Sequence, residues 1–139
     1  MDGYNAWAFE LESIIFTIVK KELLERLKET FPSIKITDKG QTVSKADFPT
    51  VYIHELPGVE MGADVFGTDI NAVMETFQVD VTTNTSKSDS REIIVNAIDV
   101  FKQLRFQIVS MPEFDDDDDE TYRFTARLRR VIGANDKLI

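Results

Sequence analysis

The stretch Met74–Leu104 constrains the fold more than any other, because it predicts a strand, a helix cap and a helix in direct succession. Over 75–82, apolar and polar side chains alternate with a period of two, which is typical of a half-buried strand. The apolar members of this alternation are Phe77, Val79 and Val81. We therefore expect this strand to lie with one face against the protein core.

A helix start follows the strand. Ser86 and Asp89 have the polar-x-x-acidic spacing of a helix N-terminus, as do Asp89 and Glu92, and such side chains accept free backbone N–H groups. An apolar stripe at helical spacing then runs through Ile94, Ala97, Ile98, Phe101 and Leu104, and Ile93 and Val100 widen it. So wide a stripe predicts burial on more than one side, either under a sheet or against a second subunit.

The composition predicts one globular domain over 1–139. Sixteen Lys and Arg residues against 25 Asp and Glu give a net charge of −9, which disfavours binding to nucleic-acid phosphates. Such a chain could still line a passage through which nucleic acid slides. The absence of cysteine excludes disulfides and thiolate metal sites. We expect no membrane span and no signal peptide, because no apolar run is long enough and the N-terminus lacks the required pattern.

The rest of the chain predicts one long helix and four further strands. The helix spans 6–31 and is followed by Pro32. The strands span 33–37, 50–56, 106–110 and 122–132, and Met111-Pro112 is expected to end the strand 106–110. Between them, 58–71 is a long irregular loop and 133–139 a short tail. The order α-β-β-β-α-β-β predicts an α+β fold: a mostly antiparallel sheet with two helices packed on one face.

The expected core combines the central strand, the second helix and the last strand. We predict that it contains Phe77, Val79, Val81, Ile94, Ile98, Phe101, Phe124 and Leu128. The last two strands should form a hairpin, with the acidic run 115–120 near its tip.

No constellation in the sequence predicts catalytic, cofactor-binding or metal-binding residues. The single histidine, His54, lies within a strand and is more readily a structural or surface residue than a catalytic one. The acidic run 115–120 lacks the glycine and glutamate positions of an EF-hand loop, so we interpret it as a solvated hairpin tip. The glycines of 58–71 match neither a dinucleotide fingerprint nor a phosphate loop.

Three arginines share one face of the last strand: Arg123, Arg127 and Arg129. They could pair across the sheet with acidic groups such as Asp80 and Glu75. They could equally contact an acidic neighbouring protein, because arginine is enriched at protein interfaces. The sequence leaves both interpretations open.

Four segments carry a resemblance to a known family: Phe48–Ile53, Phe77–Asn84, Ser86–Lys87 and Tyr122–Arg129. With the element order from 14 to 132, they resemble small tail proteins of tailed bacteriophages, in the tail terminator or tail-to-head joining group. The resemblance implies a structural, non-enzymatic virion protein assembled in the host bacterial cytoplasm. It also implies a homo-hexameric ring on the head-proximal end of the tail tube, which stops tube growth and contacts the tail tube protein and the head–tail connector proteins.

The loop 58–71 is the segment that we expect to contact neighbours in such a ring. Its apolar side chains, with the three arginines of the last strand, form the predicted interface: Val59, Met61, Val65 and Phe66. Its acidic side chains are predicted to line an electronegative passage through which DNA moves without specific binding: Glu60, Asp64 and Asp69. Two other function classes stay open, an accessory domain that binds one protein partner and a metal-dependent enzyme that uses the acidic run.

Overall fold

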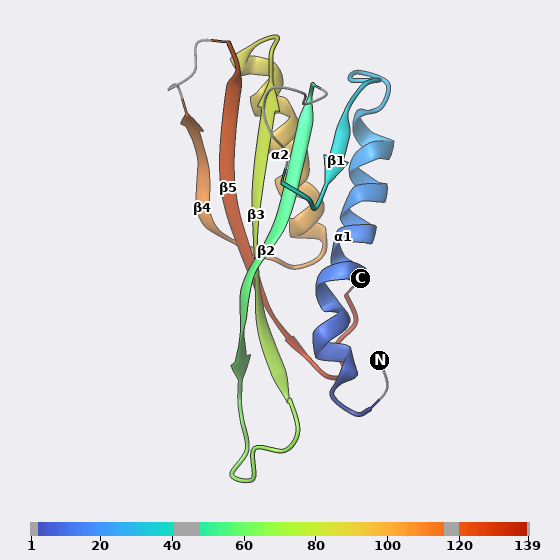
Figure 1. The fold of residues 1–139 in the computed structure, drawn as a ribbon, viewed down its shortest axis with the longest axis vertical. Helices are drawn as coiled ribbons and strands as arrows, with labels where there is room; N and C mark the ends of the chain where they lie inside the picture. The colour runs from blue at the N-terminus through green and yellow to red at the C-terminus, as the bar shows by residue number, and fades with distance from the viewer. Residues whose placement is uncertain (1–2, 41–47, 116–119, 139) are drawn as a thin grey trace.

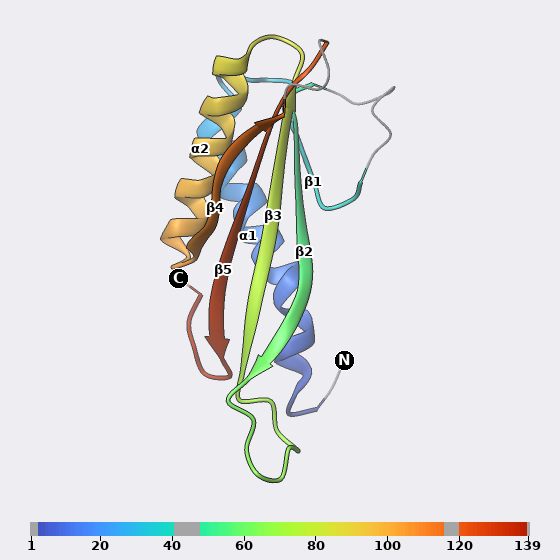
Figure 2. The same ribbon diagram turned by 90° about the vertical axis from the view of Figure 1, so that its left-hand side faces the viewer.

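In the part of the chain that the structure describes, two helices cover one face of a five-stranded sheet (Figures 1 and 2). The computed structural model describes residues 3–40, 48–115 and 120–138. The elements are α1 (Ala6–Leu27), β1 (Lys35–Thr37), β2 (Thr50–Met61), β3 (Ala72–Thr83), α2 (Lys87–Gln103), β4 (Gln107–Asp115) and β5 (Tyr122–Gly133). The strand order is β1-β2-β3-β5-β4, and only the short β1 pairs in parallel. The expected α+β class and element order are confirmed.

Helix α1 buries every fourth residue, as its sequence predicts. The buried positions are Leu11, Ile15, Val19, Leu23 and Leu27. The helix ends at Leu27, before the expected end at Phe31, although the Phe31 N–H still donates to the Leu27 carbonyl at 2.7 Å. Pro32 disfavours helical geometry in the residue before it, so the chain leaves the helix ahead of the proline.

The cap and the wide apolar stripe of α2 are confirmed. The Ser86 side chain accepts a hydrogen bond from the Asp89 N–H at 3.0 Å. This bond satisfies one of the four backbone N–H groups that have no partner within the first turn of a helix. Ile93 and Val100 are buried together with the rest of the stripe. The helix packs against β3 and β5 and also against α1, which explains why its apolar surface exceeds one narrow face.

The core is built around three aromatic rings. Phe77 of β3 lies 5.6 Å from Phe101 of α2 and 5.8 Å from Phe106, and Phe101 lies 5.1 Å from Phe106 between ring centroids. All three side chains are fully buried. All eight predicted core residues are buried as well. Edge and tilted contacts of this kind stabilise aromatic clusters beyond their buried area.

Strand β4 differs from the expectation that Met111-Pro112 ends it. It continues to Asp115, with register shifts between Ile108 and Ser110 and between Ser110 and Glu113. Because β4 is an edge strand, its outer side lacks a partner and tolerates a residue without an N–H donor. The hairpin with β5 is confirmed, while 116–119 of the acidic run lie outside the described residues.

Strands β2 and β3 form a hairpin arm that extends beyond the rest of the molecule at one end of its long axis (Figure 1). β2 runs to Met61, so the expected loop 58–71 is wrong over its first four residues, and the true connection is 62–71. The register shift between Leu56 and Val59 accommodates Pro57 and Gly58 within the paired strands. The arm is therefore a twisted hairpin closed by the loop 62–71. The end of the β4–β5 hairpin lies at the opposite end of the molecule (Figure 1).

The alternation of β5 places Arg130 on the core side, which the sequence analysis did not anticipate. Its guanidinium donates to the carbonyl of Leu104 at 2.8 Å and to those of Lys137 and Leu138 at 2.9 and 3.3 Å. Buried charge is tolerated here because carbonyl oxygens accept its N–H groups. Arg130 thus ties the end of α2 to the C-terminal tail. Over the described parts of the chain, no helix is both long and apolar enough to cross a membrane.

Candidate interaction surfaces

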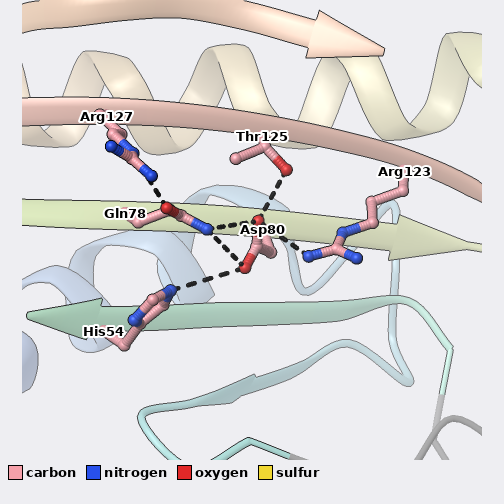
Figure 3. A network of polar contacts seen from close by, with 6 residues as sticks. All are labelled: His54, Gln78, Asp80, Arg123, Thr125 and Arg127. Atoms are coloured by element: carbon pink, nitrogen blue, oxygen red, sulfur yellow. Dashed lines mark hydrogen bonds and ion pairs between the residues drawn. The ribbon is translucent and has the colours of Figure 1, made fainter. Parts of the chain in front are cut away.

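The sheet face opposite the helices carries a network of polar side chains centred on Asp80 (Figure 3). Asp80 is only 6% exposed. Its carboxylate accepts a hydrogen bond from the Thr125 hydroxyl at 2.7 Å and lies 3.3 Å from the Arg123 guanidinium. The Gln78 amide donates to it at 3.3 Å. Because several donors surround this buried carboxylate, its charge is well compensated.

His54 joins the same network from β2. Its Nε2 lies 3.6 Å from the Asp80 carboxylate (Figure 3). Its ring stacks on that of Tyr52, with the ring centroids 4.4 Å apart. The register that pairs His54 with Gln78 and Tyr52 with Asp80 brings these groups together. The Thr125 hydroxyl donates to Asp80 and makes no hydrogen bond with His54 among the described residues. His54 thus takes part in a cross-strand network centred on Asp80.

The three predicted interface arginines differ in their contacts. Arg123 pairs with Asp80, and the Arg127 Nε–H donates to the Gln78 Oε1 at 3.0 Å. Arg129 has no ion pair or side-chain hydrogen bond with any residue in the described ranges. Cross-strand pairing is thus confirmed for Arg123 with Asp80. The suggested pairing with Glu75 is wrong, because Glu75 points to the helix side of the sheet.

The apolar residues predicted to contact a neighbour lie along the arm. Val65 and Phe66, in the loop at the tip, are 98% and 87% exposed, while Val59 and Met61 lie on β2 and are partly covered. The loop has a defined shape: the Gly67 N–H donates to the Asp64 carboxylate at 2.6 Å. The Asn5 side chain accepts from the Ile70 N–H at 2.9 Å and donates to the Thr68 carbonyl at 3.1 Å. The tip therefore presents two large apolar side chains on a hydrogen-bonded loop.

The predicted lumen acids separate into two groups. Asp64 and Asp69 lie in the exposed loop, where Asp64 also closes a turn. Glu60 lies on β2 and lines a cavity at the base of the arm. Asp115, at the start of the acidic run, lies at the other end of the molecule, as the position of β4 in Figure 1 shows. The structure thus brings only Asp64 and Asp69 together at the tip.

The cavity at the base of the arm is a feature that the sequence analysis missed. It has a volume of about 410 Å³ and lies between the first turns of α1 and the strands β2 and β3. Its walls combine four glutamates with apolar side chains: Glu12, Glu55, Glu60 and Glu75, with Ala8, Phe9, Ile70 and Val73. We call it the acidic cavity.

Glu55 and Glu75 face each other inside the acidic cavity. Glu75 is 2% exposed, and the Oε2 atoms of both glutamates are buried without a hydrogen-bond partner among the described residues. Burial, a hydrogen bond shared with Glu55 and repulsion by Glu55 and Glu12 raise the pKa of Glu75 from 4.5 to about 8. Burial is also the main cause that raises the pKa of Glu55. The pair consequently retains a proton at neutral pH and still has unused acceptor atoms.

The strand alternation contains the signal that could have revealed this pair. Glu75 shares the core face with Phe77, and Glu55 shares it with Ile53, so each glutamate occupies a position where a hydrophobic residue is expected. Their meeting across two strands depends on register, which the sequence alone did not specify. Within the described ranges, no group of three or more histidine, aspartate or glutamate side chains is arranged to hold a metal ion.

Comparison of this chain with models of known protein families found no match, and comparison with curated protein sequences found none.

Proposed function

We propose that this chain is a structural virion protein that forms a homo-hexameric ring on the head-proximal end of a bacteriophage tail tube. The ring stops growth of the tube and joins it to the head connector. The resemblance of the four segments to tail terminator proteins suggested this function. The fold is compatible with it, since two helices back one face of the sheet and, within the described residues, no helix covers the other face.

One observation carries the proposal further than the resemblance. The β2–β3 arm extends beyond the domain and holds Val65 and Phe66 almost fully exposed on a hydrogen-bonded loop. Large apolar side chains displayed in this way mark contact sites for other proteins. In a ring, the arm tip would pack on an adjacent subunit or on the end of the tube.

Electron microscopy tests the proposal directly. Negative-stain images of the purified chain should show six-fold rings, and mixtures with isolated tail tubes should show one ring at one end of each tube. A chain that stays monomeric at every concentration and leaves tube ends bare would refute the proposal and favour an accessory domain with a single partner. The variant Phe66→Ser should reduce binding to neighbours while the free chain folds normally, and Ser88→Ala on the exposed start of α2 is a matched control.

The acids of the arm tip provide a second test. If Asp64 and Asp69 face the passage, they repel DNA phosphates and prevent the DNA from binding to the wall. The double variant Asp64→Asn and Asp69→Lys removes this repulsion and keeps an oxygen acceptor for the Gly67 N–H. Rings should form normally, whereas infectivity should fall in particles that carry the variant. Unchanged infectivity would show that these acids only maintain solubility.

A further inference from the structure

We propose that the acidic cavity is a subunit-docking site that receives the Arg129 side chain of a second copy of this chain. This inference deepens the proposed ring function and rests on it. In the proposed ring, the surface that carries Arg129 on one copy would contact the acidic cavity of the adjacent copy.

The acidic cavity has the features of a site for a guanidinium group. Glu75 lines it and is almost fully buried, and its Oε2 atom has no hydrogen-bond partner among the described residues. Buried acceptors are ordinarily satisfied, and the one proton that Glu55 and Glu75 share leaves acceptor capacity of this buried pair unfilled. Phe9, which is 66% exposed, stands at the cavity with Ile70 and Val73. Apolar walls suit the stem of an arginine, and paired carboxyls suit its planar head.

A basic cleft lies across the sheet from the acidic cavity. It has a volume of about 630 Å³ and is lined by Met61, Met74, Arg105, Gln107, Arg129, Arg130 and Val131. Burial is the main cause that lowers the pKa of Arg130; the charge of Asp136 opposes this change, and repulsion by Arg105 adds a smaller effect. Arg129 is exposed and has no ionic partner within the described ranges. The cleft therefore combines the charge of Arg129, which is unpaired among the described residues, with apolar side chains of the kind found at protein interfaces.

The positions of the two surfaces favour a second copy as the partner. Met74 pairs with Val131 in the register, and both face away from the helices, whereas Val73 and Glu75 on the same strand face toward them. The acidic cavity thus lies on the helix side of the sheet, whereas Met74, Arg129 and Val131 of the basic cleft lie on the opposite face. Contacts between two different faces of identical chains are heterologous, and they form closed rings when the rotation between copies allows closure. Opposite charges on those faces select this head-to-tail arrangement over a face-to-itself dimer.

Docking of a guanidinium should also release a proton. Glu75 is surrounded by Glu12 from α1 and by Glu55 and Glu60 from β2, while its register partner Arg130 on β5 donates to backbone carbonyls instead. Its pKa of about 8 in the free chain falls when a cation arrives. The assembled form then binds fewer protons than the free form, so assembly should strengthen as the pH rises from about 6 to about 8.

Charge reversal at Arg129 gives the first test, with sedimentation velocity of the full chain as the measurement. Arg129→Glu should shift the concentration at which rings form upward by at least about tenfold. Lys28→Glu changes the charge equally on the exposed turn after α1 and should leave assembly unchanged. Assembly of Arg129→Glu at the wild-type concentration would overturn the inference.

A mixing experiment tests the pairing itself. The double variant Glu12→Lys and Glu60→Lys changes two less buried walls of the acidic cavity and spares the buried pair. Alone, at the concentration at which wild type assembles, it should not form rings, and neither should Arg129→Glu. In an equimolar mixture, the native Arg129 of the double variant can enter the native acidic cavity of Arg129→Glu. The glutamate at 129 can in turn enter the lysine-lined cavity of the double variant. Mixed rings with equal amounts of the two variants should therefore form. If the two variants stay separate, Arg129 does not meet the acidic cavity and the inference is wrong.

The outcomes distinguish this inference from the proposed function. Rings that form equally well with wild type and with Arg129→Glu overturn the docking site but leave the ring function intact. A wild-type chain that never forms rings overturns both. For wild type, assembly that strengthens between about pH 6 and about pH 8, and loses that dependence in Glu75→Gln, supports the site through a readout independent of the arginine.

Discussion

Asp80 and Glu75 lie on the same strand and face opposite sides of the sheet, and their surroundings differ sharply. Asp80 accepts hydrogen bonds from Thr125 and Gln78 and pairs with Arg123, so its buried charge is compensated within the chain. Glu75 meets only further acids, and one of its oxygens has no partner among the described residues. A satisfied carboxylate is part of the folded architecture, whereas an unsatisfied one is available to a ligand or a neighbour.

The largest expected effect on stability comes from the aromatic core, and it sets the scale for the two carboxylates. Phe101 packs against Phe77 and Phe106 in the core shared by the whole sheet. Phe101→Ala should lower the free energy of unfolding by about 3–5 kcal/mol, because it leaves a cavity among fully buried rings. Chemical unfolding measures the loss, and Val95→Ala on the exposed side of the same helix is the control. A loss below about 1 kcal/mol would show that this part of the core is misassigned.

Neutralising the satisfied carboxylate should cost stability. Asp80→Asn weakens the contacts with Arg123 and His54 and leaves donors without a charged acceptor. We expect the free energy of unfolding to fall by about 1–3 kcal/mol. Asp99→Asn on the exposed surface of α2 provides a control with the same chemical change. Equal behaviour of the two variants would mean that the network in Figure 3 contributes nothing to folding.

Neutralising the unsatisfied carboxylate should have the opposite sign. The pKa of Glu75 is raised from 4.5 to about 8, so between those values the folded chain binds more protons than the unfolded chain. Its contribution to stability is therefore fully present below about pH 4.5 and is lost as the pH rises toward 8. Glu75→Gln abolishes that loss.

Urea unfolding at two pH values measures this effect. At about pH 8.5, Glu75→Gln should be more stable than wild type by about 1–3 kcal/mol, and near pH 5 the two should differ little. Glu29→Gln, on the exposed turn after α1, should show no such pH dependence. If Glu75→Gln is instead less stable than wild type at alkaline pH, then the Glu75 carboxylate stabilises the fold, and repulsion within the buried pair is not the dominant effect.

The smallest expected effect separates folding from assembly. In the free chain, Arg129→Ala should change the free energy of unfolding by no more than about 0.5 kcal/mol, because its side chain is exposed and has no partner in the described ranges. Arg123→Ala removes a partly exposed ion pair and should cost about 0.2–1 kcal/mol. The comparison requires dilute, monomeric samples. A large loss for Arg129→Ala would assign that arginine to the fold and remove it from the interface.

Local sequence patterns by themselves determined the secondary structure and most of the core. The alternation around Phe77, the spacing of α1 and the cap at Ser86 act between near neighbours, so each could be interpreted without knowing what lies across the sheet. The same locality explains the errors at the ends of elements. β2 continues through Pro57-Gly58 and β4 through Pro112 because pairing with a neighbouring strand outweighs local turn preferences.

Only the tertiary structure decided which charged groups meet. The register of β2 against β3 places His54 beside Asp80 on one face and Glu55 beside Glu75 on the other. That register depends on which side chains are buried and on the irregularity after Leu56, and a shift by one residue would exchange the two faces. Pairing between distant residues has no local signature. The compensated network and the acidic cavity therefore emerged only when the strands were placed side by side.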